Sequence, residues 1–160
     1  MSTAFEKLLP VLVRGQVEFI LVGGVAAILH GSARLTYDVD VVYARTADNL
    51  KHLAAALKPY TPYLRGAPPG LPFSLDERTL RNGLNFTLTT ALGDLDLLGE
   101  VVGGGGFPQL RPHSFQVQAF DVQFRCVDLP TLISLKRAAG RPKDLEALAE
   151  LQALLQEQQG

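Results

Sequence analysis

The chain has 160 residues, a length that fits one domain of common size with a substantial core. Hydrophobic residues make up 47% and charged residues 19%, and no apolar run approaches the ~20 residues that a membrane span needs, so we expect a soluble globular protein. The net charge of −1 excludes the strongly basic face of a general duplex-DNA binder, and the single cysteine, Cys126, excludes an internal disulfide and thiolate metal clusters.

The amino-terminal segment predicts a helix. Thr3 and Glu6 have the spacing of a capping box, Pro10 is expected to kink or restart the helix, and Gly15 ends it. No basic leader precedes the apolar residues, so the segment does not have the pattern of a signal peptide and we expect a cytoplasmic protein.

A strand, a glycine turn, a helix and a second strand are predicted next. Residues 17–22 are apolar, β-branched and aromatic, which predicts a buried strand, and Gly23 and Gly24 break it. A short helix is expected over 25–30, and "ARLTYDVDVVYA" predicts a strand after an irregular lead-in. An amphipathic helix over 46–57 should pack over this sheet.

The middle of the chain predicts a loop and further strands. Residues 58–73 contain five prolines and two glycines, which indicates a loop and a candidate mobile flap. Residues 84–101 predict a hairpin with its turn near Leu92–Asp94, "GGGG" at 103–106 opens another loop, and residues 115–129 supply two more strands.

The carboxy-terminal part predicts two helices. Asp128 can cap the first and Gly140 can end it, and the second runs from about 142 to 157. Because no linker interrupts the chain, we expect one domain over residues 1–160, with a core of about 17–127 and C-terminal helices over about 128–157.

Two carboxylates lie in a strand that is otherwise rich in valine. Asp38 and Asp40 project from the same side of the strand, and an unpaired buried carboxylate is costly. A Mg²⁺ ion held by both would offset their charge. Upstream, Gly23 and Gly24 precede a helix, so backbone N–H groups there can face a triphosphate. Each pattern also has an ordinary explanation, a solvated strand edge for the aspartates and a strand-to-helix turn for the glycines.

A third carboxylate follows in "GDLDLL", where Asp94 and Asp96 share one face of their strand. Either could join the first pair. We prefer Asp96, because it lies between core residues, whereas Asp94 follows Gly93 and is explained as a turn residue. Three converging carboxylates suit a two-metal site.

These motifs resemble the nucleotidyltransferase superfamily related to DNA polymerase β. "LVGG", thirteen residues and "DVDV" resemble its signature, and Asp96 matches its third carboxylate. The ordered set "GG…HG…R-T…DVDVV", "LGDLDLLGEV" and "LISLKRAAGRPKDLEAL" resembles a small bacterial group that includes toxins of the AbiEii type, over roughly residues 18–151. Many members have Gly-Ser where this chain has Gly23-Gly24, so a serine hydroxyl contact to phosphate is absent.

The resemblance implies an α+β nucleotidyltransferase fold, with a mixed sheet flanked by helices and a helical C-terminal end. It implies transfer of an NMP from an NTP to an acceptor hydroxyl, with Mg²⁺ or Mn²⁺ held by Asp38, Asp40 and Asp96. Gly23 and Gly24 would face the nucleotide phosphates.

The resemblance also implies roles near the C-terminus. Lys136 matches a lysine that reaches phosphates, and Asp144 matches an acid of a "KD" motif. The alternatives are charge pairing at a helix end for the basic patch of Lys136, Arg137, Arg141 and Lys143, and a favourable helix dipole for Asp144. Arg34 could meet a triphosphate or form a surface salt bridge.

The acceptor is left open, because this fold tolerates many: tRNA or another RNA, a protein, or a small molecule. A homodimer or a small cognate partner protein would supply acceptor surface that so short a chain lacks, and a toxin–antitoxin pair would be one such arrangement. The competing hypothesis is a non-catalytic binding or partner protein with the same fold.

Overall fold

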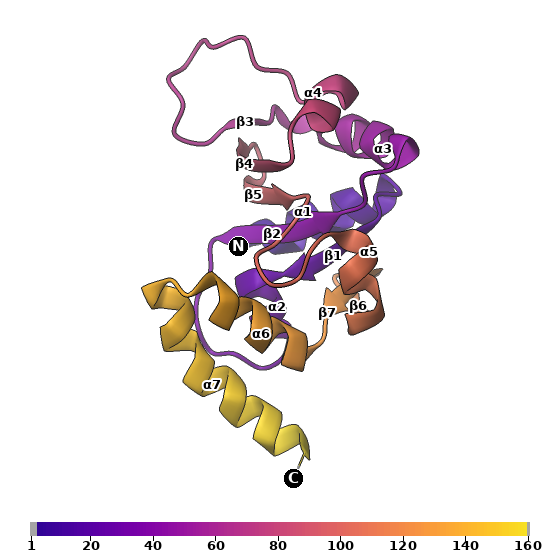
Figure 1. Cartoon of the computed structure of the whole chain (residues 1–160). Helices are drawn as coiled ribbons and strands as arrows, with labels where there is room; N and C mark the ends of the chain where they lie inside the picture. The colour runs from indigo at the N-terminus through magenta and orange to yellow at the C-terminus, as the bar shows by residue number, and fades with distance from the viewer. Residues whose placement is uncertain (1–2, 160) are drawn as a thin grey trace.

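A computed structural model describes residues 3–159 of the chain (Figure 1). Its elements, in chain order, are α1 (Ala4–Arg14), β1 (Phe19–Val22), α2 (Gly23–Leu29), β2 (Asp38–Tyr43), α3 (Ala47–Leu57), η1 (Lys58–Tyr60), β3 (Tyr63–Leu64), α4 (Glu77–Asn82), β4 (Asn85–Thr90), β5 (Gly93–Leu98), α5 (Phe107–Leu110), η2 (Arg111–His113), β6 (Ser114–Ala119), β7 (Val122–Val127), α6 (Leu129–Ala139) and α7 (Pro142–Gln159).

The strands form one mixed sheet of seven in the order β3-β4-β5-β2-β1-β7-β6. The β1–β7 and β2–β5 pairs are parallel, and the other neighbouring pairs are antiparallel. Strand β2 lies in the middle of the sheet, so Asp38 and Asp40, which it carries, are placed directly against β5.

Alternation along β2 and β5 separates a fully apolar face from a mixed one. Val39 and Val41 on β2, and Leu95 and Leu97 on β5, are completely buried in the core, and α1 packs against β2, β5, β7 and α3. The residues between them on the two strands, which include the aspartates, face the other side. In Figure 1, α2, α6 and α7 lie together below β1 and β2.

The predicted helix ends have the expected caps. Thr3, Thr46 and Asp128 each accept a hydrogen bond from a backbone N–H in the first turn of α1, α3 and α6. Gly140 ends α6 in the left-handed conformation, with φ 65°. These three helices are confirmed, and α1 runs through Pro10 as one helix instead of restarting there.

Three parts of the chain differ from the prediction, and one of them holds the unpredicted α5 and η2 after the glycine run. The segment predicted as a loop over 58–73 contains η1 and the short strand β3, which pairs with β4, and the unpredicted α4 follows. The stretch between β3 and α4 projects from the body as a long loop (Figure 1). The helix predicted over 25–30 begins earlier, at Gly23, so the glycine pair is its first turn.

The last helix, α7, extends away from the sheet beyond its packing on α6 (Figure 1). Leu151 on α7 is completely buried, and Leu148 and Leu155 pack against the core. Among residues 3–159, no helix combines the length and the apolar character that crossing a membrane requires.

Candidate active site

Four carboxylates meet where β2 lies beside β5. Because these strands are parallel and in register, Asp38 pairs with Asp94 and Asp40 pairs with Asp96. All four residues face the side of the sheet opposite the buried valines and leucines. The structure therefore brings together Asp38, Asp40 and Asp96 and adds Asp94, which sequence reasoning had set aside as a turn residue.

The pKa of Asp40 lies well above the ordinary value for an aspartate. Burial, a hydrogen bond with Asp96 and the negative charges of Asp96 and Asp38 together raise the pKa of Asp40 to about 7, and the charge of Lys136 opposes this. Within residues 3–159 no cation forms an ion pair with Asp40. Its charged form therefore lacks a counterion.

Arg65 contacts the other three carboxylates, those of Asp38, Asp94 and Asp96. Its Nη2 donates to Asp96 Oδ1 at 2.9 Å and to the Leu88 carbonyl at 2.7 Å. Its Nη1 lies 3.8 Å from Asp38 Oδ2, and its buried Nε lies 3.4 Å from Asp94 Oδ2 without hydrogen-bond geometry. Sequence reasoning missed Arg65, since it lies in the Pro- and Gly-rich segment and only the pairing of β3 with β4 brings it to the site.

The glycine pair packs directly against this site. Gly23 has φ +71°, and a Cβ atom there would collide with Asp40 Oδ2. A Cβ atom on Gly24 would lie 2.7 Å from Thr36 Oγ1. Small residues are therefore needed for the start of α2 to approach Asp40 and Thr36. This contact is a reason for the glycines that the sequence alone did not reveal, and their contact with phosphates stays a prediction.

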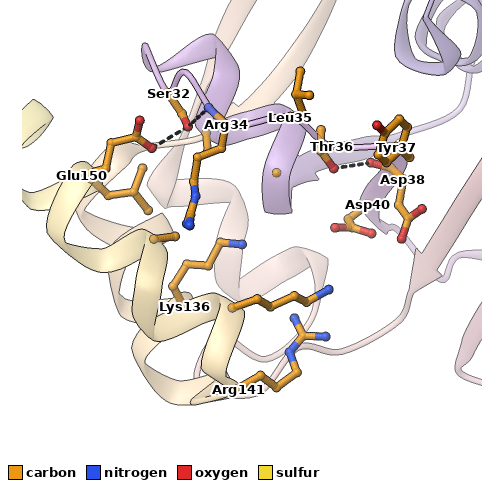
Figure 2. Close-up of a pocket in the computed structure, with 15 residues that line it drawn as sticks. Ser32, Arg34, Leu35, Thr36, Tyr37, Asp38, Asp40, Lys136, Arg141 and Glu150 are labelled. Carbon is orange, nitrogen blue, oxygen red and sulfur yellow. Dashed lines mark hydrogen bonds between the residues drawn. The ribbon is translucent and has the colours of Figure 1, made fainter.

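A cavity of about 600 Å³ opens beside Asp38 and Asp40. Figure 2 shows the two aspartates on one side of it and Lys136 and Arg141 on the other. Its charged lining residues are Arg34, Asp38, Asp40, Lys136, Arg141, Lys143 and Glu150. The predicted basic patch thus contributes three of its four members, because Arg137 does not line the cavity.

Asp144 organises the cationic side of this cavity. Its fully buried carboxylate accepts from Arg141 Nε at 2.6 Å and Nη2 at 3.2 Å, and it lies 3.6 Å from Lys136 Nζ. Burial opposes the charge of Asp144, but the hydrogen bonds and charge of Arg141, together with the charge of Lys136, hold its pKa below the ordinary value. From the first turn of α7, Asp144 therefore positions Lys136 of α6 and Arg141, which precedes α7.

The segment that leads into β2 forms the rim of the cavity. Ser32 Oγ donates to Glu150 on α7 at 2.6 Å, and the Ala33 N–H donates to the same carboxylate at 3.0 Å. Arg34 is exposed and lies 3.5 Å from Glu146. The surface salt bridge considered for Arg34 is thus present, at the mouth of the cavity.

A second cavity, of about 360 Å³, shares Asp40, Lys136 and Arg141 with the first. Its walls are mostly aliphatic and include Val22, Leu98, Val101, Leu132 and Leu135. One carboxylate therefore borders two differently lined spaces, one rich in cations and one apolar.

The residues present fit a divalent cation at Asp38 and Asp40. Both supply hard oxygen donors, and Asp40 lacks a counterion, which is the chemistry that Mg²⁺ or Mn²⁺ satisfies. Within residues 3–159, however, no three His, Cys, Asp or Glu side chains form a ready-made metal cage. Arg65 engages Asp96 and approaches Asp38 in this structure.

Cys126 takes no part in the site. Its side chain is completely buried in β7, and burial followed by the charge of Asp128 raises the pKa of its thiol to about 12. A thiol in this state is a poor nucleophile.

Comparison with known proteins identifies the fold. No family model and no curated protein matches the chain. Among solved structures, it is similar to the lincosamide antibiotic adenylyltransferase LnuA in its lincomycin-bound form, with a TM-score of 0.63 and 14% identity over 94% of this chain and 96% of that one. It is also similar to TM1012 from Thermotoga maritima, provisionally classed as a nucleotidyltransferase, with a TM-score of 0.52 and 14% identity over 94% of each chain.

The chain therefore has the nucleotidyltransferase fold, with a mixed sheet flanked by helices and a helical C-terminal end. This confirms the fold expected from the sequence. At such low identity the likeness shows the fold alone, and the narrower resemblance to AbiEii-type toxins stays a prediction.

Proposed function

We propose that this protein is a metal-dependent nucleotidyltransferase that moves an NMP from an NTP to an acceptor hydroxyl. The observation that carries the proposal is the position of Asp38, Asp40 and Asp96, which converge beside a cavity lined by cations. Carboxylates and cations adjoin in this way where a site must bind both a metal ion and phosphates.

The NTP phosphates would occupy the larger cavity. Lys136 and Arg141 are held in its wall by Asp144, and Lys143 and Arg34 add positive charge around it. Backbone N–H groups at Gly23 and Gly24 would add donors at the start of α2. The proposal thus gives Asp144 a positioning role behind two phosphate-binding cations.

Asp38 and Asp40 would hold Mg²⁺ or Mn²⁺, and Asp96, the third carboxylate of the set expected from the sequence, would act on the acceptor hydroxyl or hold a second ion. When bound, the ion supplies neutralisation of phosphate charge and of the charge that develops on the leaving group. This assignment is supported by Asp40, which has a raised pKa and no ion-pair partner among the described residues.

In the proposed reaction, the acceptor oxygen forms a bond to the α-phosphorus, and the bond from that phosphorus to the bridging oxygen of the β-phosphate breaks. Pyrophosphate leaves. The hydroxyl proton goes to the Asp96 carboxylate, which Arg65 orients through the 2.9 Å hydrogen bond. The other chain residues contribute by binding and orientation.

The second cavity supports a small molecule as the acceptor. Its aliphatic walls beside Asp40 suit a small hydroxyl compound, and LnuA, with the same fold, is an adenylyltransferase of lincosamide antibiotics. The motif resemblance to AbiEii-type toxins instead supports a toxin–antitoxin role, and an RNA acceptor is a second class to test. A protein acceptor is the third class to test.

Incubation of the protein with each α-labelled NTP, Mg²⁺ and either total RNA or cell lysate tests the proposal. We expect label to appear on one acceptor class and to disappear in Asp38→Asn. Asp121→Asn is the matched control, because Asp121 is exposed and remote in sequence from the site residues. Equal labelling by the wild type and Asp38→Asn would contradict the proposal.

The alternative is a non-catalytic protein in which the carboxylates serve only as an ion-pair cluster. The three contacts of Arg65 with Asp38, Asp94 and Asp96 favour this alternative. It predicts that Mg²⁺ has no effect on nucleotide binding, whereas the proposed enzyme requires the ion.

A further inference from the structure

We propose that Arg65 takes the place of one of the two divalent cations that a carboxylate centre of this kind can bind, so that this protein binds a single divalent cation, at Asp38 and Asp40. The inference rests on the proposed function and specifies its metal content. It also assigns Arg65 as the positioning residue for Asp96.

The first support is the position of the guanidinium. Three of its nitrogens reach three different carboxylates, with distances of 2.9 Å to Asp96, 3.4 Å to Asp94 and 3.8 Å to Asp38. Oxygen atoms from β2 and β5 thus converge on one cationic group. A second divalent ion would need the oxygens that this group already engages.

The second support is that Arg65 is built into the sheet edge. Its backbone N–H donates to the Thr87 carbonyl at 3.0 Å, and its Nη2 donates to the Leu88 carbonyl at 2.7 Å, so both ends of the residue are fixed to β4. Only 27% of its side chain is exposed. A long surface side chain that met the carboxylates by chance would lack these anchors.

The loop beyond Arg65 is tied to the same place. The Tyr63 hydroxyl donates to the Pro68 carbonyl and accepts from the Leu71 N–H. These bonds fold the start of the loop, directly after Arg65, back onto β3.

The third support is the division of charge among the four carboxylates. Arg65 contacts Asp38, Asp94 and Asp96, whereas Asp40 has no ion-pair partner in the described part of the chain. Asp40, together with Asp38, whose 3.8 Å contact with Arg65 is the longest of the three, therefore forms the position for a divalent ion. A second ion bound to the carboxylate oxygens that Arg65 contacts would lie close to the guanidinium, and the two positive charges would repel each other strongly.

With Arg65 in this position, the inferred role of Asp96 is to accept the proton of the acceptor hydroxyl. A carboxylate held by a guanidinium keeps its orientation and stays available to a hydroxyl proton, so Asp96 acts on the acceptor instead of binding a second ion.

Counting Mn²⁺ on the folded chain tests the inference without any assay of activity. Electron paramagnetic resonance of free Mn²⁺, titrated against the protein, should give one bound ion per chain for the wild type and two for Arg65→Gln. Arg81→Gln is the matched control, because Arg81 is an exposed arginine whose ion pair is with Glu77, and it should bind one ion. Circular dichroism verifies the fold of each variant.

Two bound ions on the wild type, or no gain of an ion in folded Arg65→Gln, would overturn the inference and leave the proposed function standing. No Mn²⁺ on the wild type would overturn both. If Arg65→Gln does not fold, the count on the wild type decides, since one ion supports the inference and two contradict it.

Discussion

Two charge clusters border the large cavity, one through Asp38 and Asp40 and the other through Lys136 and Arg141, and they are built in opposite ways (Figure 2). On the sheet, one guanidinium, that of Arg65, lies among Asp38, Asp94 and Asp96. On the helices, one carboxylate, that of Asp144, lies between Lys136 and Arg141. Asp144 is completely buried and its charge is matched, whereas Asp40 in the acidic cluster lacks a counterion.

This difference predicts that the basic cluster contributes mainly to stability and the acidic cluster mainly to ligand binding. In the basic cluster the charge of Asp144 is already balanced by Lys136 and Arg141, so replacement of Asp144 should lower the stability of the fold. In the acidic cluster the charge of Asp40 is balanced only when a cation binds, so its carboxylates should contribute to ligand binding, and the stability of the fold should depend on pH through Asp40.

Breaking the basic cluster at its centre should have the largest effect. Asp144→Asn leaves the mostly buried Lys136 and the exposed Arg141 without their shared, fully buried carboxylate, which should cost about 3 kcal/mol of unfolding free energy. Urea unfolding measures this. Asp121→Asn is the control, since Asp121 is exposed and its φ of 63° suits asparagine, and it should change stability by less than about 0.5 kcal/mol. Equal stability of the two variants would contradict the comparison.

Titration of Asp40 should give the acidic cluster a pH signature. The folded-state pKa of about 7 lies above the ordinary value of 3.8, so this group stabilises the fold fully below about pH 4, and that stability is lost as the pH rises to about 7. Asp40→Asn should remove this loss. The variant should therefore gain about 3 kcal/mol relative to the wild type between pH 4.5 and 8.

Denaturant unfolding at the two pH values checks this prediction. Addition of Mg²⁺ at pH 8 should restore stability to the wild type and leave Asp40→Asn unchanged, because the ion replaces the proton. A constant difference between the two proteins across this pH range would show that the Asp40 carboxylate is not perturbed.

Removal of one cation from the cavity wall should weaken nucleotide binding more than it weakens the fold. Lys136→Met keeps most of the aliphatic side chain and removes the ammonium, so the Kd for an NTP should rise about tenfold, or about 1.4 kcal/mol. Arg137→Met is the control, because the neighbouring Arg137 is exposed and does not line the cavity. Isothermal titration measures both, and equal losses of affinity would refute the assignment of Lys136.

The smallest effect should come from the rim. Ser32→Ala removes the 2.6 Å hydrogen bond to Glu150, which should cost about 1 kcal/mol and increase amide exchange at residues 33–36. Ser134→Ala is the control, since the Ser134 hydroxyl bonds only to a carbonyl within its own helix. Unchanged exchange in Ser32→Ala would show that the contact with α7 does not hold the rim.

Local patterns in the sequence predicted most of the fold. Caps such as Thr3 and Asp128, and the alternation in β2 and β5, depend on neighbouring residues and are visible in a single chain. Strand β3 and helix α4 were missed, because a two-residue strand and a six-residue helix are too short to show a periodic pattern.

The site was predictable only in part, for a similar reason. The spacing of Asp38 and Asp40 places both on one face, but the register of β2 with β5, which decides that Asp94 also joins, depends on long-range pairing. Arg65 carries no local signal. The requirement for glycine at position 23 comes from the side chain of Asp40, which is distant in sequence.

The central claim is that the acidic cluster becomes complete when it binds a metal ion together with a nucleotide. Isothermal titration of the wild type and of Asp40→Asn with ATP, CTP, GTP and UTP, each with and without Mg²⁺, tests it most directly. We predict that at least one NTP binds the wild type only when Mg²⁺ is present, and that Asp40→Asn, still folded, loses this dependence and the affinity. Nucleotide binding that is the same in both proteins and indifferent to Mg²⁺ would contradict the claim.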